Sequence, residues 1–394
     1  MPASNPFANI RIAIVHDWLD TWRGGENVLA EVLAIVPHAE LYALVDFLPP
    51  ALRPRLLGKH AHTSFLQRLP AARRSFRMLL PFFPRAITSL DLSTFDVVIS
   101  ISHAVAKGAR TRPDQLHLCY CLTPMRYAWD LRETYLASAG ASAGWRRALA
   151  DRVLDRLRAW DVACSNEVTR FLAISRYVAD RVQRCYGRDA YVVYPPVDVD
   201  FFTPPVAAAA ERSYVTASHW VPYKRLDLIV DAFRDTPQRR LIVAGGGPEL
   251  GKVRAGAPPN VRFLGAVSRE RLRDTLRAAR AFIFAAQEDF GIAPLEAQAS
   301  GTPVIAFAGG AAVETIRGLD TAEPTGVFFG EQSVASIRCA VAAFEAAEDR
   351  ITAKSCRANA MRFAADVFRH SFADYVSVAL DEFRASGRWK PKPC

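Results

Sequence analysis

The sequence predicts an α/β protein with two Rossmann-like domains, each built on a parallel sheet, that face each other across a cleft. Its 394 residues are enough for two domains of ordinary size. Short β-rich apolar runs alternate with longer amphipathic segments along the chain, which is the pattern of repeated βαβ units. Between the halves, residues 195–205 read PPVDVDFFTPP, and their prolines cannot continue a central strand. Ligands of such folds bind at the carboxyl edges of the strands, so we expect the site between the domains.

The expected strands are short apolar runs rich in β-branched and aromatic residues. In the first half they cover residues 11–16, 40–44, 97–101, 117–121, 171–174 and 191–194. In the second half they cover residues 214–217, 240–244, 261–264, 281–285 and 303–306. The expected domains are residues 1–196 and 197–370. Residues 371–394 are expected to form a helix that packs back toward the N-terminal domain.

The composition excludes several classes of protein. With 51% hydrophobic and 23% charged residues the chain is globular rather than disordered. No run of about 18 uncharged apolar residues occurs, which argues against a membrane-spanning helix. The N-terminus lacks the features of a secretory signal, so we expect a cytoplasmic protein. The seven cysteines are scattered without a CxxC pair, which predicts reduced thiols rather than a zinc site or disulfides.

An excess of basic residues predicts an anionic partner. The chain has 50 Lys and Arg against 40 Asp and Glu. Residues 51–90 hold eight Lys and Arg and no acid, interleaved with Phe, Leu and Met. This mixture is typical of an element that lies on an anionic membrane surface, and a solvated basic face over an ordinary core is the alternative. Nucleic-acid binding has only the net charge in its favour, because no known binding motif occurs, and we predict no nucleic-acid partner.

The most informative stretch is residues 281–306, AFIFAAQEDFGIAPLEAQASGTPVIA. We expect a buried strand, a loop at 287–292, and a helix that begins near Ala293 with Pro294 in its first turn, where the missing N–H costs nothing. Backbone N–H groups beside the positive end of the helix dipole would form an anion site, at Phe290, Gly291 and Ile292. A glycine in this turn lets a phosphate or sugar approach the backbone closely.

Two carboxylates flank this turn. Glu288 precedes it and Glu296 lies eight residues later on the helix. As charged acceptors, both suit the hydroxyl groups of a sugar-like ligand. The spacing alone leaves an alternative open, in which Glu296 supports the first helical turn and Glu288 is a solvated loop residue.

Several motifs carry a resemblance to a known family. They are RGGENVL at 23–29, ISHAVAKG at 101–108, LTPMRYAWD at 122–130, YPPVDVDFF at 194–202, WVPYKRLDLIVDAF at 220–233, AGGGPE at 244–249 and EDFGIAPLE at 288–296. With them the chain resembles the retaining glycosyltransferases of family 4, which have the GT-B fold. LTPMRYAWD with VPYKR is especially similar to mannosyltransferases that build O-antigen and exopolysaccharide repeat units. The resemblance extends from Ile12 to about Phe383.

The resemblance implies which residues bind a nucleotide-sugar donor. Glu288 would bind hydroxyls of the donor sugar, and Glu296 would accept from the ribose hydroxyls. The N–H groups of residues 290–292 would hold sugar and phosphate. Lys224 would neutralise the diphosphate, a role that suits the point charge of lysine.

The acceptor side is expected on the N-terminal domain. Asp17 and His16 end the first strand and face the cleft, and Asp17 is a candidate base that orients the acceptor hydroxyl. Gly24 and Gly25 precede a helix and would allow contact with donor phosphate or with the acceptor. Further acceptor contacts are expected at three residues, the last of them at an acceptor phosphate: His103, Lys107 and Arg126.

The family implies transfer with retention at the anomeric carbon and without a carboxylate nucleophile. The protein then mainly orients two substrates and stabilises charge on the leaving diphosphate, with no metal or other cofactor. Asp198 and Asp200 resemble the DxD metal motif of the other glycosyltransferase fold, but they lie in the proline-rich hinge and no metal site is predicted there. The expected reaction moves α-mannose from GDP-mannose to a polyprenyl-diphosphate-linked saccharide, at the inner face of the cytoplasmic membrane.

Two positions depart from the family pattern. His219, a catalytic candidate, stands where relatives usually have arginine, and Leu122 stands where they often have histidine. A neutral imidazole supplies less charge to the diphosphate, so transfer would depend on pH or lean more on Lys224. The alternatives are a UDP-sugar or other donor, or a catalytically weakened GT-B partner protein. A nicotinamide-dependent dehydrogenase is disfavoured, because AGGGPELG at 244–251 places its last glycine one residue late.

Overall fold

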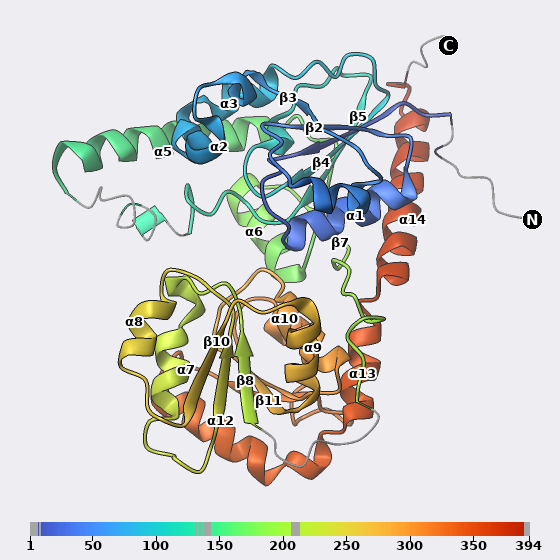
Figure 1. Cartoon of the computed structure of the whole chain (residues 1–394). Helices are drawn as coiled ribbons and strands as arrows, with labels where there is room; N and C mark the ends of the chain where they lie inside the picture. Colours follow the sequence, from blue (N-terminus) through green and yellow to red (C-terminus); the bar gives the residue numbers. More distant parts are fainter. Residues whose placement is uncertain are drawn as a thin grey trace, which may run out of the picture. The chain divides into compact units, whose positions relative to one another are not determined.

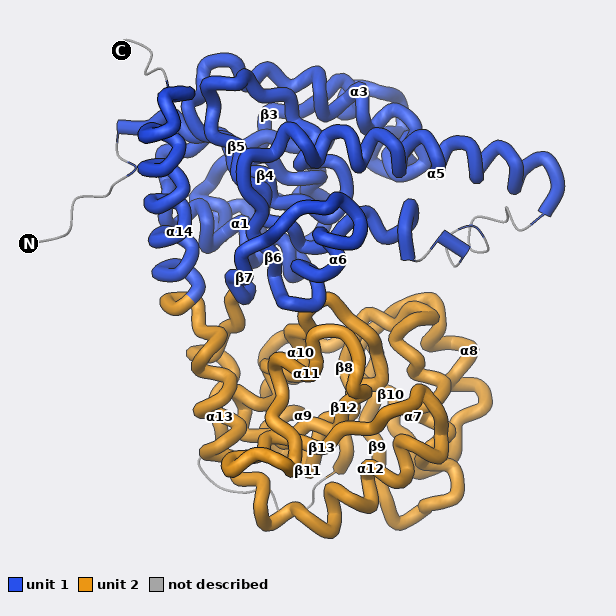
Figure 2. The backbone as a smooth tube through the Cα atoms, turned by 180° about the vertical axis from the view of Figure 1, so that it is seen from behind, with its two compact units in different colours: residues 1–195, 368–394 blue, residues 196–367 orange. Residues whose placement is uncertain are grey.

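The computed structural model describes residues 7, 9–130, 132–133, 136, 143–205 and 213–389. The chain divides into two compact units, which Figure 2 colours separately. Unit 1 comprises residues 1–195 and 368–394, and unit 2 comprises residues 196–367. The end of the predicted C-terminal segment, residues 390–394 with Cys394, lies outside the described residues.

Unit 1 is built on a seven-stranded sheet in which every described pairing is parallel (Figure 1). Its strand order is β3-β2-β1-β4-β5-β6-β7. The strands are β1 (Ile12–His16), β2 (Glu40–Ala43), β3 (His62–Thr63), β4 (Val97–Ser102), β5 (Leu116–Cys121), β6 (Arg170–Ala173) and β7 (Ala190–Val192). The α-helices are α1 (Gly24–Ile35), α2 (Ala72–Ser75), α3 (Phe83–Thr88), α5 (Gly144–Ser165), α6 (Arg176–Tyr186) and α14 (Ala365–Ala385), which begins three residues before the unit boundary. Short 3₁₀ helices are η1 (Pro50–Leu56), η2 (Phe65–Arg68), η3 (Phe76–Phe82) and η4 (Ala106–Gly108).

The sheet of unit 1 is covered on both faces, as its buried central strands require. All residues of β1, β4 and β5 are buried, which is the pattern of a central parallel strand. On one face, Ala13 and Val15 pack in a core that includes side chains of α3 and α5. On the other, Tyr120 of β5 packs edge-on against Phe368 of α14, and α14 is tied to α1 by the ion pair of Arg369 with Glu31.

Unit 2 is built on a six-stranded parallel sheet of order β10-β9-β8-β11-β12-β13. Its strands are β8 (Ser213–Ala217), β9 (Leu241–Ala244), β10 (Val261–Gly265), β11 (Ala279–Phe284), β12 (Val304–Phe307) and β13 (Gly326–Phe329). Its helices are η5 (Pro222–Lys224), α7 (Leu226–Ala232), α8 (Leu250–Ala255), α9 (Arg269–Arg277), α10 (Ile292–Ala299), α11 (Ala312–Thr315), α12 (Val334–Ala346), η6 (Glu348–Arg350) and α13 (Ala353–Met361). Side chains of α7 and α12 share one core with the strands.

The predicted fold class is confirmed in both halves. Each of the expected strands is present, and its ends differ by at most two residues from the prediction. Two strands at the edges of the sheets, β3 and β13, were not predicted from the sequence. Within the described part of the chain, no helix combines the length and apolar character needed to cross a bilayer.

Candidate active site

The predicted donor residues gather at the carboxyl edge of the unit 2 sheet. β8 leads into His219 and then to Lys224 at the end of η5, while β11 leads into the loop that holds Glu288 and then into α10. Parallel strands bring their following loops to one edge, which explains why segments far apart in sequence meet here. The geometry therefore assembles in unit 2 the side chains that the motif predicted.

Glu288 forms an ion pair with Lys224. Both side chains are mostly buried, at 16% and 13% exposure. The backbone of Glu288 is fixed by a bridge to Gly310, and its carbonyl accepts from the N–H of Ala311 at 2.9 Å. A Cβ at Gly310 would lie 2.3 Å from the Glu288 carbonyl oxygen, so this close approach requires glycine. The pair therefore sits on a braced loop beside α10.

The turn into α10 has the geometry of an anion site. Gly291 has φ of 85°, in the left-handed region that favours glycine, and it caps a helix that begins at Ile292. The helix starts one residue earlier than predicted, and Pro294 remains in the first turn, where the N–H has no intrahelical partner. The ring of Phe290 is buried against Phe363, so only the backbone of this residue is suited to ligand contact.

Glu296 is half-buried on α10. Burial raises the pKa of Glu296 to about 7, and nearby Arg269 opposes this shift while Asp198 adds to it. Below pH 7 the side chain is therefore mostly a neutral acid, and it becomes a charged acceptor as the pH rises.

If the ionised side chain of Glu296 binds the ribose hydroxyls, we expect the affinity for the donor to be lower at pH 6 than at pH 8. The ionised fraction of a group with a pKa of about 7 drops about tenfold between pH 8 and pH 6, and the affinity should follow it. Glu296→Gln should flatten this dependence. Titration calorimetry with an intact nucleotide sugar checks it, because a diester diphosphate does not titrate in this range. An unchanged slope in the variant would remove Glu296 from the nucleotide site.

His219 is exposed in the segment between β8 and η5. The next residue, Trp220, is buried, and its N–H donates to the Gly246 carbonyl at 2.7 Å. The glycine-rich loop after β9 thus supports the backbone on which His219 is carried. His219 thus lies at the same sheet edge as Lys224.

In unit 1 the predicted acceptor residues also lie at a carboxyl edge, but Asp17 has a different role from the one predicted. Its buried carboxylate accepts from four backbone N–H groups at 2.6–3.0 Å, those of residues 103–106. Burial alone would raise the pKa of Asp17, yet His103 and these bonds hold it well below the usual range. A carboxylate so saturated is a poor base, so the geometry assigns Asp17 to holding the loop after β4.

Gly24 and Gly25 begin α1 next to a buried carboxylate. Glu26 accepts from the N–H of Arg23 at 2.7 Å and lies 3.5 Å from Nε2 of His16. Burial alone would raise the pKa of Glu26, but the interaction with His16 outweighs burial and holds the pKa below its ordinary value. An ionised Glu26 satisfies the helix N-terminus, so this turn favours a hydroxyl-bearing ligand over a phosphate.

Gly25 packs closely on the end of β5. A Cβ at Gly25 would lie 3.0 Å from Leu122 and 3.5 Å from the His16 ring. Leu122 therefore contributes an apolar wall at this edge. Arg126 is half-buried in the turn that follows.

The structure corrects the prediction that Lys107 contacts the acceptor. Its side chain is 2% exposed, pairs with Asp161 of α5 and donates to the Ala104 carbonyl at 3.1 Å. Asp161 also accepts from Trp129 and Tyr186, at 2.9 and 2.7 Å. Lys107 therefore anchors the loop after β4 from below and cannot reach an acceptor, contrary to the prediction.

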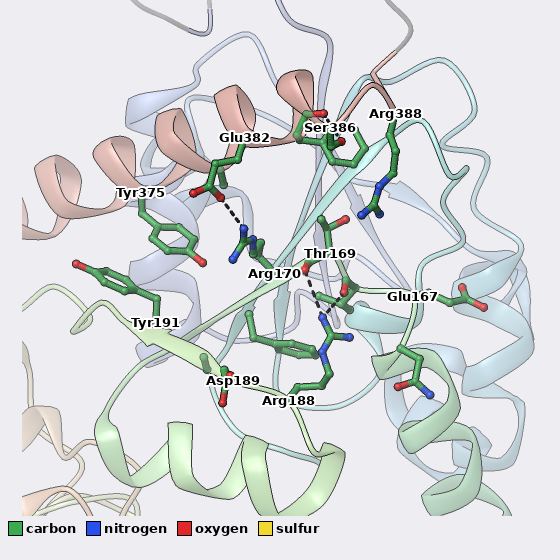
Figure 3. Close-up of a pocket in the computed structure, with 16 residues that line it drawn as sticks. Glu167, Thr169, Arg170, Arg188, Asp189, Tyr191, Tyr375, Glu382, Ser386 and Arg388 are labelled. Atoms are coloured by element: carbon green, nitrogen blue, oxygen red, sulfur yellow. Dashed lines mark hydrogen bonds and ion pairs between the residues drawn. The ribbon is translucent and has the colours of Figure 1, made fainter.

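A separate pocket of about 860 Å³ lies at the opposite edge of the unit 1 sheet. Figure 3 shows it at the amino ends of β6 and β7, against the second half of α14. An ion pair of Arg170 with Glu382 and a stacked pair of Tyr191 with Tyr375 form part of its wall. None of the predicted site residues lines it.

The sequence of unit 2 matches a family model. Residues 205–363 match the model of glycosyl transferases group 1. The matched segment lies within unit 2. The Glu288–Lys224 pair and the turn into α10 lie within this matched segment.

Two curated relatives are similar to part of this chain. The D-inositol 3-phosphate glycosyltransferase of Mycobacteroides abscessus is 33% identical over 168 residues, 37% of this chain and 38% of the relative. The GDP-mannose-dependent alpha-(1-6)-phosphatidylinositol monomannoside mannosyltransferase of Mycobacterium tuberculosis is 32% identical over 209 residues, 46% of this chain and 53% of the relative. The matches thus span about half or less of these relatives.

Solved structures establish the fold of both units. HepE of Anabaena in complex with UDP is 16% identical, with a TM-score of 0.68 over 94% of this chain and all of the other. Sucrose-phosphate synthase of Thermosynechococcus elongatus is 17% identical, with a TM-score of 0.69 over the same shares. This likeness, together with the family match, identifies the fold of the two parallel-sheet units as GT-B.

Sequence reasoning missed two residues that organise unit 1. Glu26 was given no role, although glutamate at the third position of a first turn is the mark of a capping box. Asp161, the partner of Lys107, had no local signal, because it lies 54 residues away on α5.

Proposed function

We propose that the chain is a retaining glycosyltransferase that moves α-mannose from GDP-mannose to a polyprenyl-diphosphate-linked saccharide. The observation that carries this proposal is the Glu288–Lys224 pair beside the start of α10, within a group 1 glycosyl transferase domain. One carboxylate, one ammonium and a helix N-terminus are complementary to a sugar attached to a diphosphate. The mannose donor is supported by the relative that is named for its dependence on GDP-mannose.

In this proposal the donor binds to unit 2 and the acceptor to the carboxyl edge of unit 1. The acceptor oxygen forms its bond to the anomeric carbon on the face from which the diphosphate departs. The acceptor proton passes to the leaving diphosphate oxygen, so no protein nucleophile is needed. Lys224 and the N-terminus of α10 stabilise the charge that develops on the diphosphate.

Metal independence is part of the proposal. Asp198 of the DxD pair accepts from Arg269 at 2.7 Å and from the N–H of Phe201 at 3.2 Å. These contacts account for the carboxylate as the anchor of the hinge segment. Transfer should therefore persist in EDTA.

A donor screen tests the function. Purified protein is incubated with bacterial membranes, EDTA and radiolabelled GDP-mannose, UDP-glucose or UDP-GlcNAc, with an empty-vector preparation alongside. Label from GDP-mannose alone in an extractable lipid-linked product, in the α configuration by NMR, is the expected result. Label from a UDP-sugar alone would mean that this sugar nucleotide, and not GDP-mannose, is the donor. Label from none, with membranes that a known transferase can use, would favour a weakened GT-B partner protein, as His219 and Leu122 allow.

We further propose that unit 1 binds the inner face of the cytoplasmic membrane. Its basic apolar surface comprises Arg73, Arg74, Met78 and Phe82, of which Met78 is 82% exposed and Phe82 53%. Apolar side chains next to cations suit an anionic bilayer surface. α5 carries two further exposed apolar side chains, those of Trp145 and Leu149.

Charge reversal on this surface should release the protein from anionic vesicles. Arg73→Glu with Arg74→Glu is expected to lower partitioning at least about 30-fold, since each basic residue near the surface contributes about 1 kcal/mol. Arg77 is left intact because it pairs with Asp20. The matched control reverses Lys252 and Arg254 on α8, which are also exposed, for the same change in net charge. Equal co-sedimentation of the two variants would exclude this surface.

A further inference from the structure

An oriented imidazole stands at the carboxyl edge of the unit 1 sheet. Nδ1 of His103 lies 2.9 Å from Oδ2 of Asp17. Because an ionised carboxylate only accepts, Nδ1 must carry the proton, and in the neutral ring Nε2 then carries the lone pair. The indole of Trp18 packs edge-on against the ring, with centroids 4.5 Å apart, and fixes its plane.

Nε2 of His103 is the open end of this pair. The side chain is 32% exposed, and no described residue hydrogen-bonds to Nε2. The loop itself does not depend on the ring, because Asp17 and Lys107 hold it through backbone groups. An exposed nitrogen on a ring that is fixed from behind is arranged for contact with a ligand.

We propose that Nε2 of His103 accepts the hydrogen bond of the acceptor hydroxyl, with Asp17 as the positioning residue that sets the tautomer and the loop. This inference rests on the proposed function and names the acceptor-facing atom of that site. It reverses the expected roles, because Asp17, the predicted base, never touches the acceptor.

The surrounding charges select a hydroxyl rather than a phosphate. Asp17 and Glu26 are ionised carboxylates, and Arg23 is the cation that acts on His103. The His16 ring, 6.2 Å from that of His103, is held by Glu26. Two carboxylates against one guanidinium disfavour an anion, whereas a sugar hydroxyl donates well to a neutral imidazole. The ligand of this edge is therefore the saccharide part of the acceptor.

The test compares His103→Gln with the wild type in the transfer assay. We expect the acceptor kcat/KM to fall on the order of 10- to 100-fold, with the donor KM within about twofold, since only acceptor positioning is lost. Asp17→Asn should move the acid limb of the pH profile to lower pH. The Asp17 carboxylate raises the pKa of His103 although burial lowers it, and only the neutral ring accepts. A purely structural role would lower the rate without moving that limb.

His370→Gln is the matched control, because it breaks another histidine–carboxylate pair, with Asp374 at 3.2 Å on α14. It should leave kinetics unchanged. Nitrogen NMR of histidine-labelled protein, with the His103 signals assigned by their loss in His103→Gln, should place the proton on Nδ1. A proton on Nε2, or unaltered acceptor kinetics in His103→Gln, overturns the inference. An inactive wild type that still has the proton on Nδ1 would instead count against the proposed function.

Discussion

Glu288→Ala is expected to reduce transfer by on the order of 10³-fold in kcat/KM, which is the largest single effect in unit 2. The change removes the charged acceptor for the donor sugar hydroxyls. It also leaves Lys224 mostly buried without its carboxylate, and breaking such a pair from one side costs about 3–5 kcal/mol. Steady-state transfer from the donor identified in the screen provides the measurement.

Two further variants separate charge from shape and from general damage. Glu288→Gln keeps the shape of the side chain and should retain more activity than the alanine variant, since one amide oxygen still accepts. Glu323→Ala breaks an exposed pair with Arg317 on the same unit and should leave transfer unchanged. Thermal unfolding of each variant shows whether the fold survives. Turnover of Glu288→Ala near that of the wild type would exclude Glu288 from the site.

The fold was predictable from the sequence because its central strands are buried on both faces. Strands such as Val97–Ser102 are continuous apolar or small-residue runs that no exposed segment would carry. β3 has only the residues His62 and Thr63, with no apolar signal, and β13 is a run of only four residues. Short edge strands are defined by their neighbours more than by their own residues.

The two halves of the candidate site differed in how far the sequence could predict them. Glu288 and Lys224 carry motif signals, and the structure brings these two residues into contact. Asp17 and Lys107 follow the ends of strands. This position predicts that they lie at the edge of the sheet, but it does not predict whether their side chains point toward a ligand or into the protein. Their partners are backbone groups near residue 103 and a carboxylate on α5, which no local pattern specifies. A polar residue at a sheet edge can therefore be assigned as a ligand contact or as a loop anchor only when its partners from distant parts of the sequence are known.

Lys224→Ala is expected to lower kcat by about 10²- to 10³-fold, the range for losing one preorganised group that stabilises transition-state charge. The leaving diphosphate gains charge as the sugar bond breaks, and the ammonium of Lys224 at the end of η5 is the side-chain cation that meets it in this proposal. Lys224→Arg retains the charge and should recover part of the rate. Lys252→Ala, on the exposed face of α8, serves as the control and should have no effect.

A double-mutant cycle decides whether Lys224 and Glu288 act as one unit. If each mainly supports the other, Glu288→Ala combined with Lys224→Ala should lose little more than the worse single variant, because the second change also removes a buried unpaired charge. Fully additive losses would mean that Glu288 serves the sugar and Lys224 the diphosphate independently. The donor affinity of the same four proteins, measured by calorimetry, distinguishes binding of the donor from stabilisation of the transition state. A variant that loses kcat but keeps its donor affinity has lost an interaction made only as the diphosphate leaves.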